Sequence, residues 1–267
     1  PKTPKPQGFN RISDFNFIIK MSNYTEADDY NSFIWKLRQT DFAEMYGGVE
    51  WVGNDKRLTF GTLSRFFLLS TVFYWLCFVP VLALYKRKFD AKKAGMLTNY
   101  TISQVHAIIA ILFFIGIVFS SCEKPRTNFF NNNECFDITT PGMQLALVFS
   151  LAYLVSDLLT SYMVFGPKNF METAIHHGAG FISIPCALII GKHLGAMNEC
   201  FLFTEFSTIF LNFMWILKLT GYEENHTKLK MVNSLMLVLS FVGSRMIFLG
   251  YVFFFHYIPA LMRYNWD

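Results

Sequence analysis

Six stretches of apolar residues, each close to 20 residues long, constrain the fold of this chain more than any other feature. An α-helix of about 20 apolar residues crosses roughly 30 Å of hydrocarbon, and it satisfies its own backbone hydrogen bonds on the way. Each stretch is therefore predicted to be a membrane-spanning helix. The predicted spans are residues 66–85, 102–119, 143–165, 174–191, 200–217 and 235–257.

The composition supports a membrane fold, because charged residues are 16% of the chain and about 25% of an average soluble domain. We predict an all-α integral membrane protein: a bundle of about six transmembrane helices around a central cavity, with a polar N-terminal extension. The predicted divisions are an extension over residues 1–57, a membrane domain over 58–258 and a short tail over 259–267.

The N-terminal extension carries equal numbers of acidic and basic residues. Apolar side chains at helical spacing predict an amphipathic helix over about residues 28–45, lying on the membrane surface or packed on protein. A Pro- and Lys-rich end is ordered when something holds it. We therefore expect residues 1–57 to bind other membrane-protein subunits.

Basic residues in the loops predict the orientation of the bundle, because cytosolic loops carry an excess of Lys and Arg. Nine fall in the loops after the first, third and fifth spans: Lys86, Arg87, Lys88, Lys92, Lys93, Lys168, Lys218, Lys228 and Lys230. Four fall on the other side: Lys124, Arg126, Lys192 and Arg263. The first side is therefore predicted to face the cytosol or matrix, and Cys122 and Cys135 then lie opposite, where an oxidising compartment would allow a disulfide.

Several function classes lack their sequence signals. The chain has no Walker motif, GxGxxG, HExxH or GxSxG, and no Cys/His metal spacing. Its basic residues form no patch interleaved with aromatic residues, so no nucleic-acid partner is expected. No resident cofactor or metal is expected either; the expected partner is membrane lipid, a phospholipid or a sphingolipid.

Polar and ionisable residues inside the predicted spans are the candidate site. A charge at the centre of a bilayer costs about 2.5–3.5 kcal/mol on insertion scales, so such residues face a bundle interior or a wet cavity. The candidates are His106, Asp157, His176, His177, Glu205, Asn212 and Arg245. They are expected either to line a pocket for a lipid headgroup or to hold helices together through hydrogen bonds.

Helical spacing predicts how some of these residues meet. Glu205 and Asn212 lie seven residues apart and share one face of a helix, while neighbouring residues such as His176 and His177 point about 100° apart. The two histidines therefore cannot aim at one point. Arg245 is predicted to lie within hydrogen-bonding reach of Asp157 or Glu205 as their counter-ion.

Five motifs in order resemble the TLC-domain family, which includes the ceramide synthases and the translocating-chain-associating membrane proteins. They are TISQVHAIIA, FSLAYLVSDLL, METAIHHGAG, TEFSTIFLNFMWIL and LSFVGSRMIFLGYVFF, one in each of the second to sixth spans. The resemblance implies a helical bundle around a membrane-embedded cavity. It also implies work on lipids: their synthesis, sensing or transport.

The resemblance also bears on catalysis. Ceramide synthases carry a vicinal His pair, matched here by His176 and His177, and a second motif of His-Asp followed three residues later by Asp. The corresponding segment here, TEFSTIFLN, has Glu205 as its one acid. The chain is thus more similar to the small non-synthase members than to the ceramide synthases.

We therefore expect a non-catalytic lipid-binding protein, an accessory structural subunit of a larger membrane complex, or both. As a complex subunit it is expected in the mitochondrial inner membrane, and otherwise in the endoplasmic reticulum. The alternative is a lipid N-acyltransferase like the ceramide synthases, with His176 or His177 as the base and Glu205 orienting the acceptor.

Overall fold

A computed structural model of the chain describes residues 49–52, 55–120, 130–131 and 133–263. The predicted amphipathic helix at about residues 28–45, most of the predicted extension and Cys122 lie outside the described residues.

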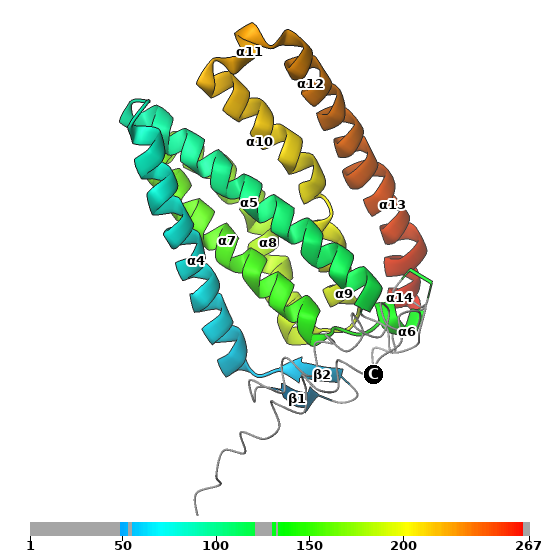
Figure 1. Ribbon diagram of the computed structural model, residues 1–267. Helices are drawn as coiled ribbons and strands as arrows, with labels where there is room; N and C mark the ends of the chain where they lie inside the picture. The colour runs from blue at the N-terminus through cyan, green and yellow to red at the C-terminus, as the bar shows by residue number, and fades with distance from the viewer. Residues whose placement is uncertain (1–48, 53–54, 121–129, 132, 264–267) are drawn as a thin grey trace, which may run out of the picture.

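Six helical segments are long and apolar enough to cross a bilayer, which confirms the predicted fold class (Figure 1). Four of these segments are single helices: α4 (Phe60–Lys86), α5 (Ala91–Ser120), α7 (Pro141–Phe165) and α8 (Pro167–Ile190). The fifth segment joins α9 (His193–Leu202) to α10 (Glu205–Thr220). The sixth is made of α12 (Thr227–Phe241), η1 (Val242–Phe248), α13 (Leu249–Val252), η2 (Phe253–Tyr257) and α14 (Ile258–Arg263).

The spans begin and end at residues that suit helix termini. Thr140 caps α7 by accepting from the Met143 backbone N–H, and Pro141 follows as the first helical residue. Gly221 ends α10 with a φ of 76° and donates its N–H back to two carbonyls of the last turn. Two short helices lie in the connections, α6 (Asn133–Phe136) and α11 (Tyr222–Asn225).

The fifth and sixth spans are less regular than their sequence predicts. The fifth breaks at Phe203 and Thr204, so Glu205 becomes the first residue of a new helix. The sixth begins at Thr227, eight residues before its predicted start, and contains two π-helical segments. A π-helical turn adds a residue to the hydrogen-bond ladder and rotates the remainder of the helix, and such turns occur frequently at functional sites. Arg245 lies in the first of these segments.

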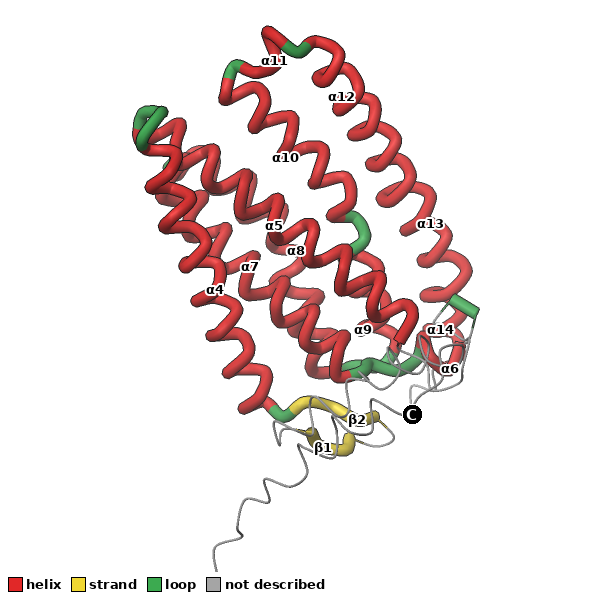
Figure 2. The backbone as a smooth tube through the Cα atoms, viewed as in Figure 1, coloured by secondary structure: helices red, strands yellow, loops and turns green. Residues whose placement is uncertain are grey.

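The helices form a bundle with α5 near its centre. α5 packs against α4, α7 and α10, while α8 packs on α7 and α12 packs on α10 (Figures 1 and 2). Outer faces are apolar and exposed, as on α4, where Leu68, Leu76 and Val79 are more than half exposed. Such faces suit contact with lipid chains, so the polar groups are left to the interior.

A short β-hairpin precedes the first span and was not predicted. Its strands β1 (Val49–Val52) and β2 (Asp55–Leu58) pair antiparallel (Figure 2). Arg57 donates from Nη1 to the Ile189 carbonyl and from Nη2 to the Ile190 carbonyl, both at 2.9 Å. The guanidinium therefore satisfies carbonyls at the C-terminal end of α8, where a cation also suits the helix dipole.

The two ends of the bundle differ in their chemistry. The turns after α4, α7 and α10 lie at one end (Figure 1), and the nine basic residues lie in these turns or in the helix ends and short helices beside them. The hairpin and Cys135 lie at the other end. Cys135 is disulfide-bonded, whereas Cys77, Cys186 and Cys200 are free. A disulfide opposite the basic end agrees with the orientation predicted from the loops.

Candidate functional site

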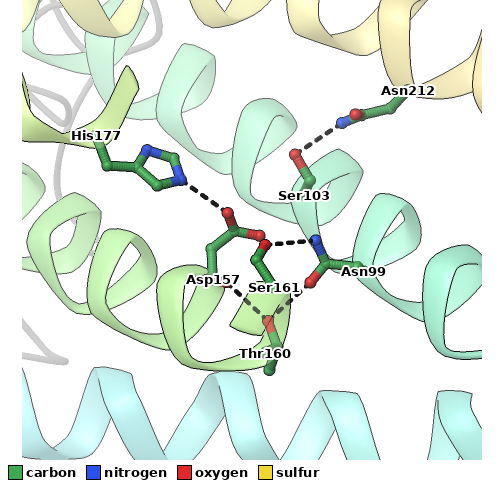
Figure 3. Close-up of polar contacts among 7 residues, drawn as sticks. All are labelled: Asn99, Ser103, Asp157, Thr160, Ser161, His177 and Asn212. Carbon is green, nitrogen blue, oxygen red and sulfur yellow. Dashed lines mark hydrogen bonds and ion pairs between the residues drawn. The ribbon is translucent and has the colours of Figure 1, made fainter. Parts of the chain in front are cut away.

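Buried polar side chains from four spans meet near the centre of the bundle (Figure 3). They come from α5, α7, α8 and α10, so segments far apart in the sequence contribute to one network. Because a bilayer offers no water to exposed polar groups, these side chains satisfy one another.

The shortest ion-pair contact of the network joins α8 to α7. His177 Nε2 lies 2.7 Å from Asp157 Oδ2, and the two side chains are 8% and 9% exposed. With Asp157 ionised, His177 donates its Nε2–H to the carboxylate. The imidazole is thereby oriented, and Nδ1 is the ring nitrogen left to exchange a proton with another group.

A second set of contacts ties Asp157 to α5 (Figure 3). Thr160 donates its hydroxyl to Asn99 Oδ1 at 2.7 Å, with the Asp157 backbone carbonyl a second acceptor at 3.1 Å. Asn99 Nδ2 donates to Ser161 Oγ at 3.3 Å. Asp157 and Ser161 lie four residues apart and so share one face of α7, and Ser161 contacts α5 through Asn99.

Asn212 and His106 extend the polar interior towards α10 and α4. Asn212 Nδ2 donates to Ser103 Oγ at 2.9 Å. His106 Nδ1 lies 3.0 Å from the Tyr74 hydroxyl, and its ring stacks on Tyr153 with centroids 3.8 Å apart. His106 is thus placed by a hydrogen bond on one side and an aromatic ring on its face.

The prediction that Arg245 directly pairs with Asp157 or Glu205 is wrong. Within the described residues, Arg245 Nε donates to Ser207 Oγ at 3.0 Å and Nη2 to Thr208 Oγ1 at 3.5 Å, and it forms no ion pair with either acid.

The physical reason lies in the helices that carry these residues. Asp157 is already paired with His177 from the adjacent α8, while Arg245 lies on the sixth span, which packs on α10. Glu205 still interacts electrostatically with Arg245, His177 and Asp157 across the interior.

The vicinal histidines point into different surroundings, as helical geometry predicts. His177 is 7% exposed, whereas His176 is among the exposed residues of α8. Their ring centroids are 5.4 Å apart. Only one member of the pair therefore contributes to the interior network.

Several network members were missed by the sequence prediction. Tyr74, Tyr153, Asn99, Ser103 and Thr160 carry hydroxyl and amide groups, which are common in spans and give little signal individually. The spacing on α5 could have identified some of them, because Asn99, Ser103 and His106 are separated by four and three residues and therefore share one helix face.

Glu199 on α9 was also missed and lies in different surroundings. It is fully buried, and neither of its carboxylate oxygens has a hydrogen-bond partner among the described residues. It falls between two predicted spans in the sequence, where a loop is expected.

A narrow crevice reaches the network from α4. Its lining residues come from α4, α5 and α7: Tyr74, Trp75, Phe78, Ile102, Ser156, Asp157 and Thr160. It has space for about one water molecule. The crevice is lined by three of the six spans, so it is not the predicted cavity at the centre of the bundle, which stays a prediction.

The arrangement can accept a hydrogen bond at Asp157 and exchange a proton at His177. No group of three or more His, Cys, Asp or Glu side chains suited to a metal ion occurs within the described residues. The site residues brought together are Asp157, His177, Asn212 and His106. Glu205 and Arg245 lie on the α10 side, and His176 is exposed.

Comparison with known proteins agrees with this architecture. A family model of the TLC domain matches residues 96–266, which is more than half of the chain and includes every candidate site residue. No curated protein and no solved structure matches the chain. The chain is a multi-pass membrane protein that belongs to the TLC-domain family.

Proposed function

We propose that this protein binds a membrane lipid, with the polar end of the lipid at the Asp157–His177 pair. The observation that carries the proposal is this buried pair, in which His177 Nε2 lies 2.7 Å from Asp157 Oδ2, beside a crevice that Asp157 also lines. Intramembrane ionisable groups that face a bundle interior mark functional sites by default. The TLC family includes lipid-handling members, which supports the same role.

The binding role is non-catalytic. His176 is exposed and forms no hydrogen bond within the described residues, and the acid-rich motif of the ceramide synthases is absent from the segment around Glu205. In this role Asp157 and His177 fix the polar end of the lipid, and apolar side chains of the spans contact its chains.

An acyltransferase is the second candidate, favoured by the orientation of His177. A histidine held by a carboxylate through one nitrogen can act as a general base through the other. In this version Asp157, rather than Glu205, orients the base, and His177 Nδ1 takes the proton of an amine or hydroxyl acceptor.

One experiment separates the two candidates. Purified protein in nanodiscs is incubated with a sphingoid base and acyl-CoA, and lipid that co-purifies with it is identified by mass spectrometry. Bound lipid without product supports the binding role, with less lipid recovered from His177→Ala and no change for His176→Ala. Product that disappears in His177→Ala overturns it in favour of the acyltransferase.

The proposal extends to an accessory structural role in a larger membrane complex, with residues 1–57 contacting partner subunits. The mitochondrial inner membrane is the proposed location for such a subunit, and the endoplasmic reticulum is the location for a free-standing protein. Native electrophoresis of solubilised membranes tests this: migration with a large assembly supports the subunit role, and migration as a monomer refutes it.

A further inference from the structure

The crevice between α4, α5 and α7 has polar and apolar lining residues. We call the polar ones, Ser156, Asp157 and Thr160, its floor; the others are Tyr74, Trp75, Phe78 and Ile102. Trp75 is half-buried, whereas Tyr74 and Phe78 are buried. Trp75 is the one lining residue that is partly exposed, so the crevice comes closest to the outside of the bundle there. Leu76 and Val79 on the same helix are more than half exposed.

The floor has hydrogen-bonding capacity that the protein does not use. Ser156 is 4% exposed, and its hydroxyl has no hydrogen-bond partner among the described residues. A buried hydroxyl left without a partner is unfavourable, so a ligand or water is expected to supply one. Asp157 beside it is an acceptor when ionised, and it is held in place by His177.

Size and charge select the kind of group that fits. The space holds about one water-sized group, which suits a hydroxyl and excludes a phosphate with its several oxygens. An anionic group would also meet the Asp157 carboxylate at close range. Arg245, the cation of the interior, interacts with Ser207 and Thr208 on α10 and does not line the crevice.

We infer that this crevice binds the hydroxyl group of an uncharged lipid alcohol that enters sideways from the bilayer between α4 and α7. The hydroxyl donates to Asp157 and accepts from Ser156, and the hydrocarbon part lies outside against Trp75 and the apolar surface of α4. This inference rests on the proposed lipid-binding function and narrows its ligand class.

The test uses the full chain in phosphatidylcholine nanodiscs with two photoactivatable lipids of identical chains, a diacylglycerol and a phosphatidic acid. Cross-linked peptides are mapped by mass spectrometry. The diacylglycerol probe is expected to label peptides of α4 and α7 saturably and several-fold more than the phosphatidic acid probe.

Ser156→Ala is expected to reduce this labelling by about three- to tenfold, the equivalent of one hydrogen bond. Ser150→Ala is the matched control. Ser150 is also buried on α7 with an unpartnered hydroxyl, but it does not line the crevice. Its labelling and its thermal stability are expected to equal those of the wild type.

The outcomes separate the inference from the function on which it rests. Saturable labelling of the interior that is equal for both probes, or unchanged by Ser156→Ala, overturns the lipid-alcohol site and leaves lipid binding intact. Lipid binding itself is overturned if neither probe labels the protein saturably and His177→Ala does not change the amount of co-purified lipid. The crevice then holds water alone.

Discussion

Asp157 and His177 lie on adjacent spans and are joined at 2.7 Å inside the bundle, each less than a tenth exposed. Removing one member leaves the other buried without its partner, and breaking such a pair costs about 3–5 kcal/mol. His177→Ala is therefore expected to lower the free energy of unfolding in detergent by an amount of this order, measured by thermal or denaturant unfolding.

The same pair offers an internal check. Replacing both residues together with leucine leaves neither polar group buried without its partner, and such replacements are often neutral or stabilising. The double variant Asp157→Leu/His177→Leu should thus recover most of the stability lost in His177→Ala. His176→Ala, at the exposed neighbour, should stay within about 0.5 kcal/mol of the wild type. A double variant as unstable as the single one would contradict this account.

The contacts of Arg57 predict a second effect on stability, at the junction of the hairpin with α8. Arg57→Ala removes two hydrogen bonds from a charged donor to the end of α8, which together contribute about 3–6 kcal/mol. Gly191→Ala is expected to destabilise as well, because Gly191 has a φ of 71° and an added Cβ would overlap the Arg57 guanidinium. Unfolding midpoints measure both, with the exposed Arg65→Ala as the control.

Arg245 and Glu205 are predicted to be coupled without direct contact. Arg245→Gln removes the cation nearest to the α10 side of the interior, so Glu205→Gln should cost less in that background than in the wild type. A double-mutant cycle is expected to give about 0.5–3 kcal/mol. A second cycle that combines Arg245→Gln with Glu223→Gln is the control, because Glu223 pairs with Lys230 on the basic end. Equal coupling energies in the two cycles would refute the prediction.

The wild-type residue Glu199 is predicted to lower the stability of the folded protein. A buried carboxylate with no partner costs free energy, and an apolar residue of similar volume removes that cost, by about 1–4 kcal/mol in comparable cases. Glu199→Met should therefore raise the unfolding midpoint, while the exposed Glu224→Met should leave it unchanged. A lower midpoint for Glu199→Met would mean that a water, ion or lipid satisfies the carboxylate.

Labelling of introduced cysteines can test the orientation of the bundle in the membrane directly. In sealed vesicles with the cytosolic or matrix face outward, Lys88→Cys is expected to react with a membrane-impermeant maleimide. Arg263→Cys at the other end should react only after detergent is added. The free cysteines among the described residues, Cys77, Cys186 and Cys200, lie within spans. The unmodified chain gives the labelling background, and the reverse labelling pattern would overturn the orientation.

The spans were predictable because their signal is local. About twenty apolar residues suffice to define each one, and turn residues such as Gly166 and Pro167 mark where they end. The opposite directions of His176 and His177 also follow from the helix alone.

The pairing of polar groups was not predictable in the same way. Which cation meets Asp157 depends on which helix packs beside α7, and no local pattern fixes that choice. The break before Glu205, the π-helical turn at Arg245 and the burial of Glu199 likewise depend on packing between spans, and so does the docking of Arg57 on α8.

The exposed His176 next to the buried His177 has a consequence for how α8 is held. One residue along this helix separates an exposed side chain from a buried one. A rotation of α8 by about 100°, as a one-residue insertion in the α7–α8 turn would cause, would bring His176 to Asp157 and turn His177 outward. The vicinal pair therefore gives α8 two alternative rotations, each of which places a histidine beside Asp157. The packing of α8 against its neighbours, rather than the histidines themselves, decides which rotation the helix adopts.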